Sequence, residues 1–149
     1  MSFASSRRRF VRRFETASEQ ETIAVGEQIA QELPSQAVVL LIGNLGAGKT
    51  TLAKGIAKGL KAAEPDEVSS PTFTLIHEYG GGRLYHVDLY RLESEAQAQA
   101  LGLDEIFERK AVVLVEWGEK FPNVIPPHPI EIRLRSLDAG RREVLYKVK

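Results

Sequence analysis

The sequence predicts an α/β domain in which a mixed β-sheet carries flanking helices and antiparallel hairpins. Residues 37–42 (AVVLLI) and 111–115 (AVVLV) are continuous apolar runs, which are typical of buried central strands. A glycine-rich loop joins the first run to a segment with helical character. Further along the chain, pairs of strand-like runs flank glycine-containing turns, a pattern that is typical of hairpins.

Length and composition indicate a single domain over residues 1–149. Apolar residues make up 43% of the chain and charged residues 27%, as in ordinary globular domains. The chain has no Cys, which excludes a disulfide scaffold, a thiol nucleophile and a Cys-ligated metal site, and which is consistent with a cytoplasmic location. No apolar stretch approaches the roughly 18 residues of a membrane span, so we expect no membrane association.

The net charge is zero, but the basic residues are unevenly distributed. Residues 1–14 contain five Arg and no acid, which leaves 15 basic and 20 acidic residues in the remainder. A body with net negative charge is not typical of a protein that binds nucleic acid by itself. We interpret residues 1–14 as a basic tail or an edge strand, with an Arg- and Ser-rich transit peptide as the alternative.

The first part of the chain predicts strand, helix, strand and helix in that order. Residues 9–16 mix apolar and basic side chains, as an edge strand does. Ser18 begins a capping box, and apolar residues at helical spacing follow it until Pro34. The apolar run 37–42 is the central strand, and residues 50–60 form the helix after the glycine-rich loop.

The rest of the chain predicts a hairpin, two short helices, a strand and a closing hairpin. Gly80 to Gly82 separates the strands of the first hairpin, and a Pro-rich loop precedes the second. The predicted elements are residues 72–79 with 83–90, then 93–101, 104–107 and 111–115, and finally 130–134 with 143–148.

Residues 43–50 (GNLGAGKT) match the P-loop (Walker A) pattern G-x-x-x-x-G-K-[ST] at every fixed position. The preceding strand and the following helix supply the context that this motif requires. Glycines let successive N–H groups turn inward, and the helix N-terminus adds partial positive charge. The candidate nucleotide-binding residues are therefore Asn44, Leu45, Gly46, Ala47, Gly48, Lys49, Thr50 and Thr51.

Within this loop, Lys49 supplies a charge for the β- and γ-phosphates, and the Thr50 hydroxyl is placed to ligate Mg²⁺. Thr51 can face the α-phosphate with its amide or hydroxyl. Thr16 and Ser18, before the first helix, are candidates for part of an adenine pocket.

A P-loop also needs an acid near the metal, at the end of a neighbouring buried strand. Glu116 ends the second wholly apolar run and is the better candidate for a metal ligand. Asp88 follows a less apolar run and can orient water or a metal-bound water, with a surface carboxylate as the alternative. Trp117 should point to the opposite face of the strand from Glu116, where it packs or meets a partner. His77 and His86 are interpreted as surface or cross-strand histidines.

The sequence contains no N-K-x-D pattern, which most GTPases use to read guanine, and this favours ATP. A small-molecule kinase would need an Arg-rich lid, whereas the arginines at 83, 91 and 109 are scattered. Residues 69–72 (SSPT) form either a plain turn or a connector that senses the γ-phosphate. A minimal ATPase that acts as a switch is the favoured class. A small-molecule kinase and a non-catalytic nucleotide-binding module are the alternatives.

Several segments together resemble the TsaE family, also called YjeE, which comprises bacterial P-loop ATPases of tRNA threonylcarbamoyladenosine biosynthesis. The similarity extends over residues 18–134, and the five segments occur in the same order as in the family. They are residues 43–51 (GNLGAGKTT), 70–74 (SPTFT), 86–92 (HVDLYRL), 102–107 (GLDEIF) and 115–119 (VEWGE).

The resemblance implies a P-loop core, the cofactors ATP and Mg²⁺, and the partner proteins TsaD and TsaB. These partners install threonylcarbamoyl on adenosine 37 of tRNA, and the ATPase reaches tRNA through them. By the same resemblance, Lys49 and Thr50 serve the phosphates and Mg²⁺, and Glu116 is the second metal ligand. Asp88 is the acid needed for hydrolysis, and Trp117 matches a family Trp that is important for activity.

Overall fold

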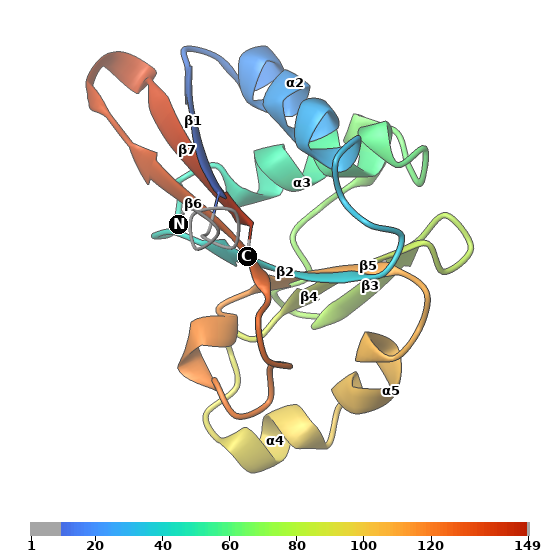
Figure 1. The fold of residues 1–149 in the computed structure, drawn as a ribbon. Helices are drawn as coiled ribbons and strands as arrows, with labels where there is room; N and C mark the ends of the chain where they lie inside the picture. Colours follow the sequence, from blue (N-terminus) through green and yellow to red (C-terminus); the bar gives the residue numbers. More distant parts are fainter. Residues whose placement is uncertain (1–9, 149) are drawn as a thin grey trace, which may run out of the picture.

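The computed structural model describes residues 10–148, whose strands form one seven-stranded mixed sheet in the order β1-β7-β6-β2-β5-β4-β3 (Figure 1). Strands β2, β4, β5 and β6 are parallel, and β1, β3 and β7 pair in antiparallel fashion. The predicted fold class is thereby confirmed. The strands are β1 (Phe10–Thr16), β2 (Ala37–Ile42), β3 (Ile76–Tyr79), β4 (Leu84–Asp88), β5 (Val112–Glu116), β6 (Ile130–Ser136) and β7 (Arg142–Val148).

Helices cover both faces of the central strands (Figure 1). Helices α2 (Glu19–Ala30) and α3 (Lys49–Gly59) lie together on one face, and α4 (Glu95–Gln99) and α5 (Leu103–Phe107) lie on the other. A Cβ atom at Gly55 would lie 2.1 Å from the carbonyl oxygen of Ile23, so α2 and α3 pack closely only because residue 55 is glycine. Short 3₁₀ turns η1 (Pro65–Glu67), η2 (Gly118–Lys120) and η3 (Asp138–Gly140) occur in the connections.

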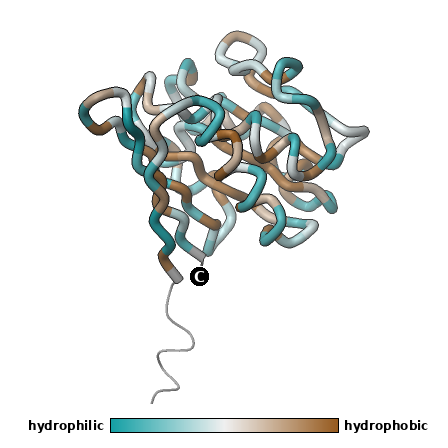
Figure 2. Tube along the Cα trace, turned by 90° about the horizontal axis from the view of Figure 1, so that it is seen from above, coloured by the Kyte–Doolittle hydropathy of each residue, from teal (hydrophilic) through white to brown (hydrophobic). Residues whose placement is uncertain are grey.

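Two apolar clusters fill the space between the sheet and its helices. Leu41, Leu114 and Ile132 belong to the cluster beneath α2 and α3, and Val113 and Val115 belong to the cluster beneath α4 and α5. In Figure 2, hydrophobic residues are concentrated along the strands in the interior, and hydrophilic residues occur in many of the surrounding segments. Successive residues of β5 belong alternately to the two clusters. Strands β2 and β5 are therefore buried on both faces, which explains why their sequences are continuously apolar.

The strand register places two carboxylates side by side. In the parallel pairs, Glu116 lies opposite Leu41 of β2 on one side and opposite Asp88 of β4 on the other. Both acids therefore end their strands at the sheet edge where the loop after β2 begins. The predicted neighbourhood of the 37–42 and 111–115 strands is confirmed by the β2–β5 pair.

Some predicted boundaries were wrong for identifiable reasons. Residues 72–75 form a turn rather than the start of a strand, because the Leu75 N–H bonds back to the Pro71 carbonyl at 2.6 Å and Leu75 has φ of +72°. Helix α2 ends at Ala30, before Pro34, and α4 is shorter than predicted. Arg12 and Arg13 lie on β1, as the edge-strand interpretation expects, whereas residues 1–9 lie outside the described part. None of the helices in residues 10–148 has the length and apolar character needed to cross a bilayer.

Candidate functional site

The loop between β2 and α3 is shaped by two glycines with positive φ. Gly46 and Gly48 have φ of +81° and +103°, conformations that residues with a Cβ rarely adopt. Helix α3 begins at Lys49, and no side chain caps its N-terminus. Its first N–H groups are therefore available to an anion, and the helix dipole adds to that preference.

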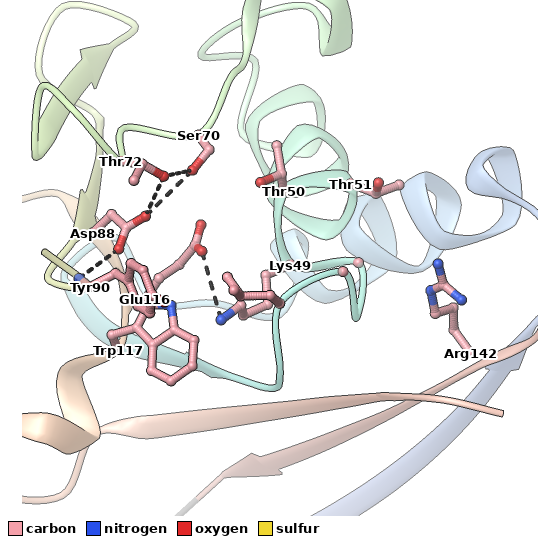
Figure 3. A pocket seen from close by; sticks show the side chains of 13 residues that line it. Lys49, Thr50, Thr51, Ser70, Thr72, Asp88, Tyr90, Glu116, Trp117 and Arg142 are labelled. Atoms are coloured by element: carbon pink, nitrogen blue, oxygen red, sulfur yellow. Dashed lines mark hydrogen bonds and ion pairs between the residues drawn. The ribbon is translucent and has the colours of Figure 1, made fainter.

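A cavity of about 310 Å³ lies over this loop and the carboxyl ends of β4 and β5 (Figure 3). Its walls combine the glycine-rich loop, the two strand-end acids, the 69–72 connector and an arginine from β7. The lining residues are Leu45, Gly46, Gly48, Lys49, Thr50, Thr51, Ser70, Thr72, Asp88, Tyr90, Glu116, Trp117 and Arg142.

Lys49 is 5% exposed and has three polar or aromatic neighbours. Its Nζ donates to the Gly43 carbonyl at 2.7 Å, lies 4.0 Å from Glu116 Oε1, and sits 4.1 Å from the centre of the Trp117 ring. Burial lowers the pKa of Lys49, although Glu116 and other nearby acids partly offset this. A phosphate group would restore the stabilisation that burial removes from the ammonium.

A buried histidine on the adjacent strand β4 contacts the Glu116 carboxylate. His86 Nε2 lies 2.6 Å from Glu116 Oε2, and both side chains are nearly inaccessible to solvent. His86 is therefore not a surface histidine, and of the two interpretations given from the sequence the cross-strand one holds, because its partner Glu116 lies on the adjacent strand β5. His86 lies on the same face of β4 as Asp88, two residues before it, and this i, i+2 relation on a buried strand was the signal available in the sequence.

Asp88 is held by a loop and not by the core. Its Oδ2 accepts hydrogen bonds from Thr72 Oγ1 at 3.0 Å and from Ser70 Oγ at 3.4 Å, and its Oδ1 accepts from the Tyr90 N–H at 2.9 Å (Figure 3). Asp88 is 2% exposed, so the alternative of a surface carboxylate does not apply. The 69–72 connector lines the cavity through Ser70 and Thr72.

Trp117 does not point away from Glu116 as strand alternation predicts. Strand β5 ends at Glu116, and Trp117 takes a left-handed conformation with φ of +63°, which turns its ring back over the cavity (Figure 3). The ring lies 5.1 Å from that of Tyr90 and covers Lys49. The prediction failed because the period of two holds only while the strand continues.

Comparison with known proteins identifies the family. The family model described as "Threonylcarbamoyl adenosine biosynthesis protein TsaE" matches residues 16–144. The chain belongs to the TsaE family. Members of this family are named for tRNA threonylcarbamoyladenosine biosynthesis, and the resemblance stated from the sequence is confirmed.

The matches span most of this chain and most of each relative. TsaE of Bacillus subtilis is 39% identical over 136 residues, which is 90% of this chain and 84% of the relative. TsaE of a Nostoc species is 42% identical over 85% of this chain and 80% of the relative. The crystal structure of Bacillus subtilis YdiB is similar with a TM-score of 0.76 and 32% identity, covering 95% of this chain and 87% of that one.

The predicted loop residues of this TsaE-family chain do not all face the same space. Six of the eight line the cavity, whereas Ala47 is buried in the core and Asn44 lines a different cavity of about 410 Å³ beside β6 and β7. Ser18 lines a small adjoining cavity of about 110 Å³ with Thr51 and Arg142. Thr16 is buried, and its hydroxyl is 2.7 Å from that of Thr22.

Besides Tyr90, sequence reasoning missed one other lining residue of the cavity, Arg142. It begins β7 and lines both the main cavity and the small adjoining one, close to Gly48. Its position follows from the sheet order, which brings the C-terminal hairpin next to β2. No local sequence pattern around residue 142 predicts that it lies at the cavity, because its position depends on segments that are far apart in the chain.

The donors in the cavity fit Mg²⁺ bound together with a phosphate. Thr50, Glu116 and Asp88 offer hard oxygen atoms, which Mg²⁺ prefers. Within residues 10–148, no three His, Asp or Glu side chains form a group that would hold a metal ion by themselves. Mg²⁺ typically takes one or two protein oxygens and completes its shell with phosphates and water, so this sparse donor set suits it.

Proposed function

We propose that this protein binds ATP with Mg²⁺, hydrolyses it, and acts as a nucleotide switch on the TsaD–TsaB complex in tRNA threonylcarbamoyladenosine biosynthesis. The observation that carries the proposal is that one cavity joins Lys49 and Thr50 to the carboxylates of Asp88 and Glu116. Membership of the TsaE family supports the pathway. The family resemblance also supplies the partners, and a cytoplasmic location follows from a role on tRNA.

The phosphates of ATP would lie over the 43–50 loop. The N–H groups at the start of α3 donate to them, and Lys49 exchanges its contact with the Gly43 carbonyl for the β- and γ-phosphate oxygens. Arg142 lies beside Gly48 and Thr51, where it is suited to the α-phosphate or ribose. Ser18 borders the same small cavity, which favours this side for the nucleoside.

Thr50 and Glu116 would hold the metal, which neutralises charge that develops on the β- and γ-phosphate oxygens. Glu116 Oε1 faces the cavity near Lys49, while Oε2 is engaged by His86. Thr50 is on the first turn of α3 and lines the cavity beside the loop.

Asp88 would orient the attacking water. It faces the cavity beside Glu116, and a carboxylate can accept further hydrogen bonds besides those from Thr72, Ser70 and the Tyr90 N–H. Attack of the water oxygen on the γ-phosphorus forms one P–O bond and breaks the bond to the bridging oxygen, which leaves with ADP. The water protons pass to the phosphate or to Asp88.

The connector at residues 69–72 would report the state of the nucleotide. Its Ser70 and Thr72 hydroxyls bond to Asp88 and can turn toward a γ-phosphate when one is present. Figure 3 places Arg142 across the cavity from Asp88, so its charge does not reach the site of attack. We therefore expect slow hydrolysis by the isolated chain and faster hydrolysis when a partner supplies a cation.

The test is steady-state ATP hydrolysis, alone and with the TsaD–TsaB pair, with labelled γ-phosphate followed to its product. A low rate that rises strongly with the pair, with phosphate released to water, supports the switch. A rate that the pair does not change contradicts the partner role. Transfer of the label to a metabolite would instead support a small-molecule kinase.

A further inference from the structure

Buried His86 makes a single polar contact, and that contact is to the proposed metal ligand. Its side chain is 1% exposed, and Nε2 lies 2.6 Å from Glu116 Oε2. The other ring nitrogen, Nδ1, is the one buried side-chain polar atom without a hydrogen-bond partner among the residues that the structure describes. His86 thus satisfies Glu116 while leaving half of its own hydrogen-bonding capacity unused.

A buried histidine with an unpaired ring nitrogen is energetically unfavourable if its role is only to pack. On this face of the sheet Leu84, two residues before it, and Leu114, opposite it on β5, are apolar, whereas His77 lies opposite it on β3 and Asp88 two residues after it. An apolar side chain would fill such a site without an orphan nitrogen, which costs free energy in a buried environment. The histidine is therefore better explained by its contact with Glu116 than by the packing of the core.

The contact also gives the two carboxylate oxygens of Glu116 different surroundings. An ionised carboxylate only accepts hydrogen bonds, so when Glu116 is ionised this contact requires the His86 tautomer that carries its proton on Nε2. Oε2 is thereby occupied from the core side, and Oε1 is directed toward the cavity, 4.0 Å from Lys49 Nζ. Without the histidine, the carboxylate would be free to rotate about its last bond.

We propose that His86 is a positioning residue that fixes the Glu116 carboxylate by one oxygen, so that the other oxygen is presented to Mg²⁺ in the nucleotide complex. This inference rests on the proposed function and deepens it. Groups that orient a metal ligand from behind typically contribute about 10- to 100-fold in metal affinity. His86 does not line the cavity, so the affinity for nucleotide without metal should not depend on this residue.

The test uses two amide substitutions of the full chain that differ by one methylene. The amide nitrogen of His86→Gln extends as far as Nε2 does and can donate to Glu116, whereas the shorter amide of His86→Asn stops near the position of Nδ1. Affinity for a non-hydrolysable ATP analogue is measured by calorimetry with Mg²⁺ and with EDTA. Binding of Mn²⁺ in the presence of ADP is followed by electron paramagnetic resonance.

We expect H86N to bind the nucleotide in EDTA as the wild type does and to lose about tenfold of the enhancement by the metal. H86Q should recover most of that loss. Leu84→Ala, on the same strand and face, is the control for destabilisation: it should lower the Tm and leave the metal enhancement unchanged. His86→Leu gives the same comparison if the buried amide of H86N prevents folding.

The failures of the two proposals are distinguishable. If the wild type binds the nucleotide more tightly with Mg²⁺ and H86N, or H86L, keeps the full enhancement, the positioning role of His86 is overturned and the proposed function stands. An equal loss in H86N and Leu84→Ala overturns it too, because the effect would then follow stability. A wild type that binds no nucleotide under either condition overturns the proposed function and this inference together.

Discussion

The two carboxylates at the site lie opposite each other in register but are supported by different parts of the molecule. Glu116 ends a strand in the middle of the sheet and is held by His86, which is itself buried in the core. Asp88 ends the next strand and is held by hydroxyl groups of the 69–72 connector and by the Tyr90 N–H. One wall of the cavity is therefore built on the sheet, and the other depends on a loop.

This difference indicates a division between binding and switching. A group fixed by packed core residues keeps its place whether or not a ligand is present. A group held by partly buried hydroxyls of a connector can change partners at small cost, because one hydrogen bond contributes only about 1 kcal/mol net. We expect substitutions on the Glu116 wall to affect metal and nucleotide binding, and those on the Asp88 wall to affect hydrolysis and its response to partners.

The largest effect is expected for Glu116→Gln. The change removes the charge that faces Lys49 and the proposed metal, and should lower the partner-stimulated rate of ATP hydrolysis by about 10³-fold. The measurement is phosphate release at saturating Mg²⁺. The matched control is Glu108→Gln, an exposed acid outside the cavity, whose rate should stay within a factor of about two. Equal rates for the two variants would contradict a metal role for Glu116.

Asp88→Asn should lower hydrolysis by about 10²-fold and leave nucleotide affinity nearly unchanged. The amide keeps an acceptor for the Tyr90 N–H, so the loop should remain in place, but it is a much weaker acceptor for a proton from water. Single-turnover hydrolysis and calorimetry separate the two quantities. Asp104→Asn, which changes an exposed acid of α5, is the control. A parallel loss of affinity would show that Asp88 belongs with the binding wall.

Nucleotide affinity should also depend on pH through Lys49. Burial lowers the pKa of Lys49 in the free protein, whereas bound phosphate favours the charged ammonium and raises it. Affinity should be constant below the free-protein pKa and fall as pH rises through it, by up to about tenfold per pH unit. Calorimetry with ADP in EDTA at increasing alkaline pH tests this. Lys49→Arg, which stays charged, should bind without the alkaline fall.

The smallest effect is expected for Thr72→Val, which removes one hydroxyl from Asp88. The cost in stability should be about 1 kcal/mol, and the basal rate should change by only a few-fold. The stimulation by TsaD–TsaB should fall further than the basal rate if the connector transmits the state of the nucleotide. Thr74→Val is the control, because Thr74 bonds to His77 and not to Asp88. Equal effects of both variants would argue against a specific role for Thr72.

The sequence predicted the strand-centred parts of the site better than the rest. The apolar runs located β2 and β5 and so placed Glu116 beside the glycine-rich loop, because fully buried strands leave an unambiguous local pattern. The loop motif located Lys49 and Thr50 because its fixed positions are close together in the sequence. The roles assigned to these residues remain predictions that the experiments above address.

What the sequence missed depends on tertiary structure. Trp117 was misplaced because the backbone leaves the strand at that residue, which alternation alone does not reveal. The contact of His86 was not identified beyond a surface or cross-strand position, because a histidine in a strand is often partly exposed and only the β4–β5 register puts it beside Glu116. Arg142 was missed because the order of strands, and not any nearby motif, brings β7 to the loop.

The pairing of β1 with β7 has a consequence for biosynthesis. Arg13 of β1 and Glu143 of β7 are joined by a hydrogen bond although they are 130 positions apart in the chain. During translation, β1 leaves the ribosome long before β7, its neighbour in the sheet that residues 10–148 form, so this edge closes last. Arg142 arrives with the same strand, and a ribosome-bound chain that lacks β7 would carry the glycine-rich loop without its arginine. Capture of the proposed nucleotide should therefore strengthen only once β7 has been synthesised.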